Sequence, residues 1–495
     1  MRDFQRIMVK SSIKKNYILN LINTLTGLVF PLITFPYASR ILFAEGIGQV
    51  QFFQSIIDYI ALCSALGIPL YAVREIARNR DNVPTRSKTT IEVLLLHVLL
   101  TFAGYIIVAI LAVTIKKIEV NIPLFLLLST TLLFNTIGVN WFYQAVEDFK
   151  YITIRSLVIR LFSLIALFLF VKTPNDLLYY AGITVIANVG GNIFNFIRLR
   201  KFIQPNSFSF REISLARHLK PALQIFILNL TISIYVNLDS VMLGFIKSEE
   251  AVGYYTAATK LTKAILGIIS SLGLVLLPRF SNMISNGEFT EFKSLANKVI
   301  SFTIALSLPL SIGLIFMSPI LINLFCGKDF APSILTLQLI APIILFIGLS
   351  GIIGMQILYP QGKEKIVILA TTCGAFINFT LNLLLIPRYS QYGAAIATTF
   401  AELTVVTAVI FFGRQMLPVH FLSKQNLHYV IGSILIALCL CLIQYVHLPD
   451  IYELITGILI SGLVYGFYLY LNKDIFIIQT IDTIKSIITK RFQHE

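Results

Sequence analysis

Five charged side chains in the interior of long apolar segments are the residues of this sequence most able to do chemistry. Two are lysines, Lys260 and Lys263, whose spacing of three places both ammonium groups on one face of a helix. Three are carboxylates in separate segments, Asp58, Asp239 and Glu402. A charge inside a membrane is costly and usually faces a cavity or a partner. The lysines therefore indicate an anionic substrate group, and the carboxylates indicate either coupling to Na⁺ or H⁺ or a permanent ion pair with the lysines.

Amide side chains form polar stripes along two stretches of apolar sequence. Helical spacing relates the members of each stripe: Asn16, Asn20, Asn23 and Gly27 in the first, and Asn229, Ser233 and Asn237 in the second. Residues in such a stripe either bind one membrane helix to another or line a cavity. For each stripe as a whole we favour a cavity wall. In the first stretch Pro31 and Pro36 also predict interruptions of the helix.

The elements that position these residues are predicted to be membrane-spanning helices. Of the 495 residues, 57% are hydrophobic and only 13% are charged, whereas soluble domains have about 25% charged residues. The apolar residues form blocks of about 20, the length at which an α-helix crosses a bilayer. The net charge of +15 reflects membrane topology and not nucleic-acid binding, because most lysines and arginines fall in alternate loops.

Fourteen spans account for these blocks and predict an all-α polytopic membrane protein. We place them at about 16–38, 47–69, 90–114, 122–144, 153–171, 178–199, 221–245, 252–277, 297–318, 334–359, 365–387, 392–413, 427–447 and 451–471. The alternation of basic loops predicts that both termini are cytoplasmic. The connection at 39–46 is expected to be a short outer turn.

An internal duplication indicates two pseudo-symmetric lobes of six helices each. A shift of 205 residues places Glu45 on Glu250, Gly48 on Gly253, Asp58 on Lys263 and Arg74 on Arg279. We therefore expect an N-terminal lobe at 1–199, a basic cytoplasmic linker at 200–220, a C-terminal lobe at 221–413, and two extra C-terminal helices with a cytoplasmic tail at 414–495.

Motifs for catalysis, metal binding and nucleotide hydrolysis are missing from the sequence. The five cysteines include no CxxC pair, the six histidines show no ligand spacing, and no glycine-rich loop ends in a Walker lysine. His97 stands inside a span, where a lone histidine favours a structural role. We expect a protein that is not an enzyme, with no catalytic residue, no metal site and no cofactor other than a coupling Na⁺ or H⁺.

Three stretches of the sequence carry longer motifs. The first combines FPYASRIL, EGIGQVQFFQSI and LGIPLYAVREIA between Phe35 and Ala77; the second is NWFYQAVEDFKYITIR, Asn140 to Arg155; the third is LDSVMLGFIKSEEAVGYYTAATKL, Leu238 to Leu261. Together they resemble the polysaccharide-transport branch of the MOP exporter superfamily, the Wzx-type flippases. The chain departs from that family at Phe43 and Ala44, where Gly-Pro is usual, and at Ala145, where Gly is frequent.

This resemblance implies a substrate, a mechanism and a location. The substrate would be a polyprenyl-diphosphate-linked oligosaccharide, carried by alternating access from the inner to the outer leaflet of the bacterial cytoplasmic membrane. The diphosphate would bind to Arg40, Lys260 and Lys263, and the sugar hydroxyls to amides of the cavity: Gln51, Gln54, Asn20, Asn23, Asn229 and Asn237. Membrane lipids, the polysaccharide polymerase and chain-length proteins are the further partners expected, and nucleic acid is not one.

Other functions stay open on the sequence alone. A cation-coupled multidrug exporter of the same superfamily would have an acidic cavity and few buried lysines, so Lys260 and Lys263 argue against it. A flippase for a peptidoglycan or teichoic-type lipid precursor is a closer alternative. A polymerase of the same pathway usually has a large outer loop, and the outer loops here are short. A membrane scaffold that transports nothing is a further class.

Overall fold

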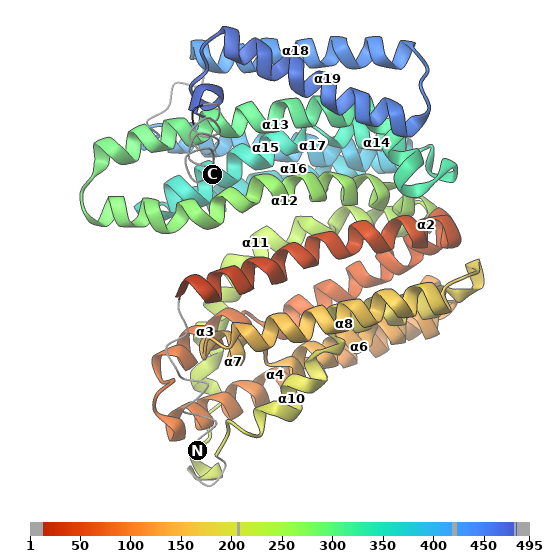
Figure 1. The fold of residues 1–495 in the computed structure, drawn as a ribbon. Helices are drawn as coiled ribbons and strands as arrows, with labels where there is room; N and C mark the ends of the chain where they lie inside the picture. Colours follow the sequence, from red (N-terminus) through yellow and green to blue (C-terminus); the bar gives the residue numbers. More distant parts are fainter. Residues whose placement is uncertain (1–12, 205–207, 418–422, 480–481, 483–495) are drawn as a thin grey trace, which may run out of the picture. The chain divides into compact units, whose positions relative to one another are not determined.

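The computed structural model describes residues 13–204, 208–417, 423–479 and 482, and these residues form helices with no strand among them. Packing divides the chain into two compact units, Met1–Gly253 and Tyr254–Glu495, here called the N-terminal and C-terminal units (Figure 1). Among the described residues, twelve helical segments are long and apolar enough to cross a membrane. One of them, 18–78, contains the first two predicted spans, and α11 (Ala216–Ile246) holds the seventh. The predicted all-α, fourteen-span membrane architecture is thereby confirmed.

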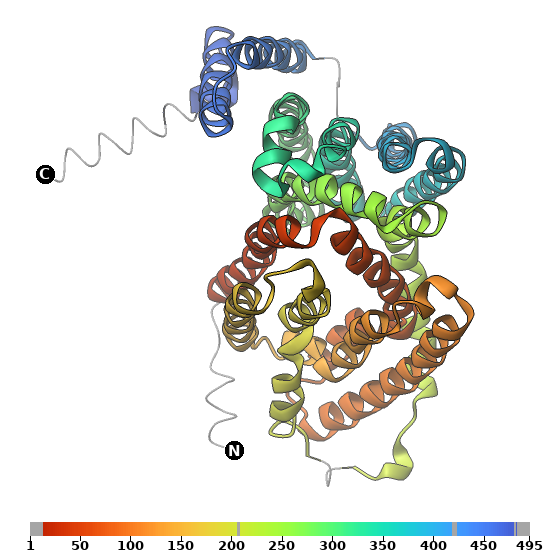
Figure 2. The same cartoon turned by 90° about the vertical axis from the view of Figure 1, so that its right-hand side faces the viewer.

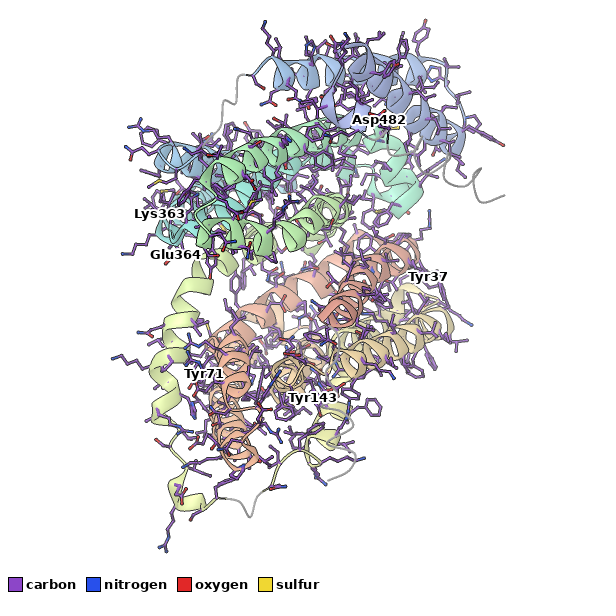
Figure 3. The ribbon with its side chains drawn as sticks, turned by 60° about the vertical axis from the view of Figure 1, so that its left-hand side comes forward. Tyr37, Tyr71, Tyr143, Lys363, Glu364 and Asp482 are labelled. Carbon is purple, nitrogen blue, oxygen red and sulfur yellow. The ribbon has the colours of Figure 1, made fainter. Side chains whose placement is uncertain are left out.

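The described residues of the N-terminal unit form ten α-helices and the first turn of the next one. They are α2 (Ile13–Ala65), α3 (Ile68–Arg78), α4 (Val83–Thr114), α5 (Lys116–Glu119), α6 (Ile122–Gly138), α7 (Asn140–Ala145), α8 (Phe149–Phe170), α9 (Leu177–Val185), α10 (Asn192–Leu199) and α11, followed by α12 (Glu249–Ser285). A buried aromatic core joins α3, α4 and α7, with Tyr71 and Tyr143 in it (Figure 3). The Tyr143 hydroxyl donates to the carbonyl oxygen of Asn195 at 2.7 Å, which fixes α7 to α10.

The C-terminal unit continues along α12, and its described residues form seven further α-helices. They are α13 (Phe289–Cys326), α14 (Ser333–Ile340), α15 (Ile343–Gly351), α16 (Glu364–Tyr389), α17 (Gln391–Gly413), α18 (Lys424–Tyr445) and α19 (Asp450–Leu471). Figure 2 shows α18 and α19, in blue, as a separate pair at the edge of this unit. They pack on α13 through a small core around Met317 and Leu440, and the Tyr465 hydroxyl donates to the Ala305 carbonyl oxygen at 2.8 Å. The lobe boundaries at 199 and 221 are inferred from the internal duplication of the sequence, and they stay a prediction.

The first two predicted spans form the two arms of α2, which meet at a sharp bend. The first arm continues through Pro31 and Pro36, and the backbone leaves helical geometry at Phe43 (φ 55°, ψ −176°). The bend lies within the turn expected at 39–46, whereas the interruptions expected at the prolines are wrong. Membrane helices tolerate proline where neighbouring helices, hydroxyl side chains or water bond the freed carbonyl groups. In Figure 1 the chain turns back at this bend.

We expect the substitution Phe43→Gly to stabilise the protein. Phe43 adopts a backbone conformation that glycine alone reaches without strain, and such strain costs on the order of 1–3 kcal/mol. Its side chain is 43% exposed, so little packing is lost. The midpoint of thermal unfolding of the detergent-solubilised protein should rise. Phe102→Gly is the matched control on α4, where an exposed phenylalanine has helical geometry and glycine should lower the midpoint. If the midpoint of thermal unfolding falls for both variants, the backbone at Phe43 is not strained.

Helix α2 and the start of α12 cross with their backbones in contact. A Cβ atom at Gly48 would lie 1.6 Å from the Glu249 carbonyl oxygen, and one at Gly253 would lie 1.9 Å from the Ala44 carbonyl oxygen. Only glycine fits at either position. The shift of 205 residues pairs these same two glycines, so equivalent positions of the two sequence copies meet at this crossing.

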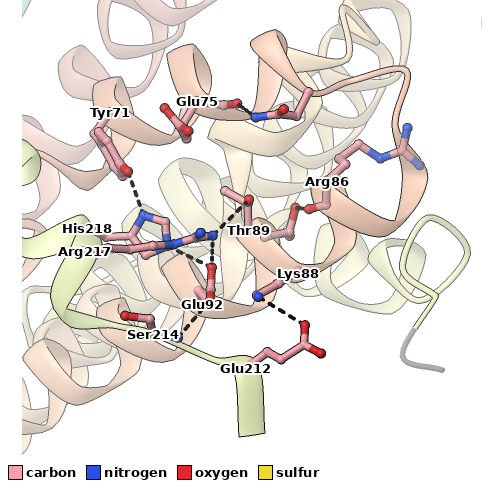
Figure 4. Close-up of polar contacts among 12 residues, drawn as sticks. Tyr71, Glu75, Arg86, Lys88, Thr89, Glu92, Glu212, Ser214, Arg217 and His218 are labelled. Carbon is pink, nitrogen blue, oxygen red and sulfur yellow. Dashed lines mark hydrogen bonds and ion pairs between the residues drawn. The ribbon is translucent and has the colours of Figure 1, made fainter. Parts of the chain in front are cut away.

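The start of α11 is fixed to the rest of the N-terminal unit by Glu92 of α4 (Figure 4). Glu92 is fully buried. Its Oε1 accepts from the backbone N–H of Ser214 at 2.9 Å, and its Oε2 contacts Arg217 and lies 3.0 Å from Nε2 of His218. The hydroxyl of Tyr71, on α3, lies 2.6 Å from Nδ1 of the same histidine. One carboxylate thus joins α4 to the first turn of α11, and His218 extends the contact to α3.

We expect Glu92→Gln to lower the free energy of unfolding by about 1–3 kcal/mol, because the amide cannot replace a buried, charge-assisted acceptor. Denaturant unfolding of the purified protein measures this. Glu212→Gln is the matched control: Glu212 pairs with Lys88 at 3.3 Å but is 59% exposed, so its loss should cost under about 1 kcal/mol. Equal effects of the two substitutions contradict a special role for Glu92.

Acid should weaken the same contact. His218 lies in the first turn of α11, within the predicted 200–220 linker. Burial, opposed by its hydrogen bond to Glu92, lowers the pKa of His218 below the ordinary value. The unfolded chain therefore takes up a proton at His218 more readily than the folded chain. The stability from neutral His218 is present above about pH 6.5 and is lost as the pH falls below it. The free energy of unfolding, measured with denaturant at several pH values, should fall as the pH falls below about 6.5. His218→Gln should reduce this pH dependence.

Candidate substrate cavity

The N-terminal unit contains a cavity of about 530 Å³, with walls from α2, α3, α4, α6, α7 and α11. Its lining is mixed, and the polar members are Asp58, Tyr59, Ser64, His97, Thr101, Asn135, Thr136, Asn140, Trp141, Gln144 and Asn237. None of the described residues that line it is a lysine or arginine. The volume is in the range of small-molecule sites. Chemically the cavity offers amides, hydroxyls, an imidazole and one carboxylate.

Two amides hold Asp58 at the cavity wall. Gln54, one turn earlier on α2, donates to Oδ1 at 2.8 Å, and Asn237 of α11 donates to Oδ2 at 3.4 Å. The structure thus brings together three of the residues expected from the sequence, although Asn237 is 179 positions from Asp58. The carboxylate is placed to bind a cation or a proton, and it also links α2 to α11.

The other two predicted carboxylates are in different surroundings. Asp239 is buried in α11, and its charge acts on Tyr59, a residue of the cavity wall. Glu402 is buried in α17 of the C-terminal unit. Asp58 and Asp239 therefore belong to one unit and Glu402 to the other.

The first amide stripe contacts a neighbouring helix at Asn23. The Ser156 hydroxyl donates to Oδ1 of Asn23, and Arg160 donates to the Asn23 carbonyl oxygen at 3.0 Å, both from α8. Asn20 is exposed, and its carbonyl oxygen accepts from Thr24 at 2.9 Å. At Asn23 the stripe binds helix to helix, which is one of the two interpretations that the sequence left open.

Two further predicted amides have different outcomes. Gln51 donates to the Ser55 hydroxyl at 3.2 Å, one turn along α2. The side chain of Asn229 lies outside the described residues, as does that of Ser233. Their proposed contact with sugar hydroxyls stays a prediction.

The predicted cations divide between the two units. Arg40 on α2 is exposed and donates to the Pro36 carbonyl oxygen at 3.3 Å. Lys260 is half-buried and Lys263 exposed on α12 of the C-terminal unit, and the charge of Lys263 acts on Lys260. The lysines thus form a local pair of positive charges, and their convergence with Arg40 stays a prediction.

Sequence reasoning missed His97 and Trp141 as cavity residues. Both line the cavity, with exposed fractions of 4% and 3%. Nδ1 of His97 and Nε1 of Trp141 have no hydrogen-bond partner within the described part of the chain. The available signal was the spacing of His97 and Thr101, which places two polar side chains on one face of an otherwise apolar helix. The Thr101 hydroxyl lies 2.6 Å from that of Thr136, across to α6.

Comparison with known proteins supports a carrier of polysaccharide precursors. The family described as polysaccharide biosynthesis protein matches residues 13–284, and the MatE family matches residues 225–384. A Shigella dysenteriae protein described as an O-antigen transporter is 26% identical over 79% of this chain and 98% of its own. An Escherichia coli K12 protein of the same description is 24% identical over 82% of this chain and 97% of its own.

The solved structures that resemble this chain agree on the fold. The lipid II flippase MurJ superposes with a TM-score of 0.71 at 18% identity, covering 93% of this chain and 99% of that chain. An inward-facing multidrug resistance transporter of the MATE family gives a TM-score of 0.62 at 13% identity, covering 80% and 97%. Since the first family matches more than half of the sequence, this chain belongs to the polysaccharide biosynthesis protein family.

Proposed function

We propose that the chain is a flippase for polyprenyl-diphosphate-linked oligosaccharides, the lipid-linked repeat units of O-antigen, capsule or exopolysaccharide. It moves them by alternating access from the cytoplasmic to the outer leaflet of the bacterial inner membrane, with both termini cytoplasmic. The observation that carries this proposal is a polar cavity, whose described lining has no lysine or arginine, inside one unit of a polysaccharide-family membrane protein. Relatives described as O-antigen transporters support the class of substrate.

The charged and polar residues are assigned to different parts of the substrate. Sugar hydroxyls enter the polar cavity, and the diphosphate binds to Lys260, Lys263 and Arg40, because an anion is costly to desolvate without cations. The polyprenyl chain stays in the bilayer. Asp58 or Asp239 binds the coupling Na⁺ or H⁺, and Glu402 is the equivalent candidate in the C-terminal unit.

Flipping of the native substrate tests the proposal directly. The protein is reconstituted in vesicles together with its native pool of lipid-linked oligosaccharides. This pool is extracted from the strain that naturally makes the protein, after the gene has been deleted. Periodate, which does not cross the membrane, oxidises only sugars on the outer leaflet. In vesicles without protein the oxidised fraction should stay near one half, and with protein it should rise toward completion. A Na⁺ or proton gradient that changes this rate supports coupling, and Asp58→Asn should then remove the dependence.

The same vesicles separate the alternatives. Flipping of lipid II at the same rate as the native pool indicates a peptidoglycan precursor as substrate. Gradient-driven export of ethidium without flipping of the pool indicates a multidrug exporter. If correctly folded protein shows neither activity, the proposal that it is a transporter is refuted.

A further inference from the structure

The residues that line the N-terminal cavity differ in their hydrogen bonding. Both oxygens of Asp58 accept from amides, Gln54 and Asn237. His97 and Trp141 are more than nine-tenths buried, and each has a nitrogen without a partner in the described residues. An unsatisfied buried polar group costs about 1–3 kcal/mol, and each such group in a native protein calls for an explanation. A ligand that enters the cavity, reorients these side chains and bonds their nitrogens supplies one.

We infer that the cavity residues His97, Trp141, Asn135 and Gln144 bind an uncharged sugar residue of the substrate; this deepens the proposed function and rests on it. The amides of Asn135 and Gln144 are exposed at the cavity wall, and each offers both a donor and an acceptor. The indole N–H is a donor, and a neutral imidazole offers one donor and one acceptor. Sugar hydroxyls, which donate and accept, match this set.

Charge argues against a diphosphate in this cavity. A diphosphate would enter without a cation, since the described lining has no lysine or arginine and includes the carboxylate of Asp58. The cavity volume of about 530 Å³ leaves room for a sugar ring and water.

Trp141 is the one tryptophan of the chain, so its fluorescence reports on this site alone. Three probes come from the native pool: the intact lipid-linked oligosaccharide, and the two products of hydrolysis of its sugar–phosphate bond, free oligosaccharide and polyprenyl diphosphate. In protein reconstituted in nanodiscs, the intact lipid and the free oligosaccharide should change the emission in a saturable way. Polyprenyl diphosphate should leave it unchanged. An equal change with polyprenyl diphosphate, or with NaCl or a pH step alone, overturns the inference.

Exposed cavity residues give variants that should still fold. We expect Asn135→Ala combined with Gln144→Ala to raise the half-saturating concentration of free oligosaccharide by roughly tenfold, since two hydrogen bonds are lost. Asn175→Ala is the matched control, because Asn175 is exposed and is not one of the cavity residues. Unchanged half-saturation in the double variant refutes the site.

Failure of this inference and failure of the proposed function are distinguishable. Periodate-detected flipping with no emission change for any probe rejects the sugar site but keeps the flippase. An emission change with the free oligosaccharide but no flipping keeps the site and rejects transport.

Discussion

Replacing Gly48 by valine is expected to abolish correct folding. The new Cβ would overlap the carbonyl oxygen of Glu249, at 1.6 Å, and approach the backbone nitrogen of Gly253 at 2.7 Å. Both obstacles are main-chain atoms of a helix, which cannot move aside as a flexible side chain does. Overpacking of a core costs about 1–3 kcal/mol and occasionally more, and here helix α12 itself would have to shift.

Size-exclusion chromatography of a fluorescent fusion measures this effect. Gly48→Val should lose most of the monodisperse peak, and Gly253→Val should do the same because its Cβ would lie 1.9 Å from the Ala44 carbonyl oxygen. Gly466→Val is the matched control: no atom lies within 4 Å of a Cβ at this position on α19. A monodisperse Gly48→Val protein would show that the crossing is not this close.

Removing the lysine pair on α12 should strongly reduce export of lipid-linked oligosaccharide. A diphosphate carries about two negative charges, and each costs several kcal/mol to desolvate without a partner. Lys263→Ala should lower the flipping rate by at least about tenfold at normal protein level, which corresponds to roughly 1.4 kcal/mol. Lys260→Arg should be milder, because the charge survives although its geometry changes.

Flipping in vesicles and surface polysaccharide in cells are the measurements. Lys293→Ala is the control, since Lys293 is an exposed lysine near the start of α13 in the same unit. A double variant, Lys260→Ala with Lys263→Ala, that is abundant and still supports full surface polysaccharide would falsify the diphosphate site. The two lysine side chains would then only extend their ammonium groups to the headgroup region of the bilayer, without binding substrate.

The sequence predicts the helices of this protein well because length and hydropathy are local properties. The bend of α2 is different: Pro31 and Pro36 are the strongest local signals for a break, yet the backbone breaks at Phe43. A membrane helix can continue through proline when its surroundings bond the freed carbonyl groups, and those surroundings cannot be read from composition. The turn expected at 39–46, from the gap between the first two apolar blocks, contains the observed break.

The candidate site is only partly visible in the sequence for a similar reason. Asp58 and Asn237 are conspicuous polar residues in apolar segments, so each is identifiable alone. Periodicity gives the face of a helix but not the helix that covers it. The helical spacing of Asn23 therefore predicts a cavity wall, whereas its hydrogen-bond partners are side chains of α8. The contact of Glu92 with His218 joins positions 126 apart, and no local pattern predicts it.

The bend at Phe43 also has a consequence for biosynthesis. With one non-helical residue between them, the two arms of α2 leave the ribosome as a helical hairpin with almost no loop. At 1.5 Å per residue each arm is about 30–45 Å long, enough to cross the hydrocarbon core. In the proposed orientation the tip of the hairpin must be translocated, and Arg40 and Glu45 are the charged residues nearest to Phe43 on either side. Because these charges have opposite sign, the tip crosses with no net charge, and the two arms can enter the membrane together as one insertion unit.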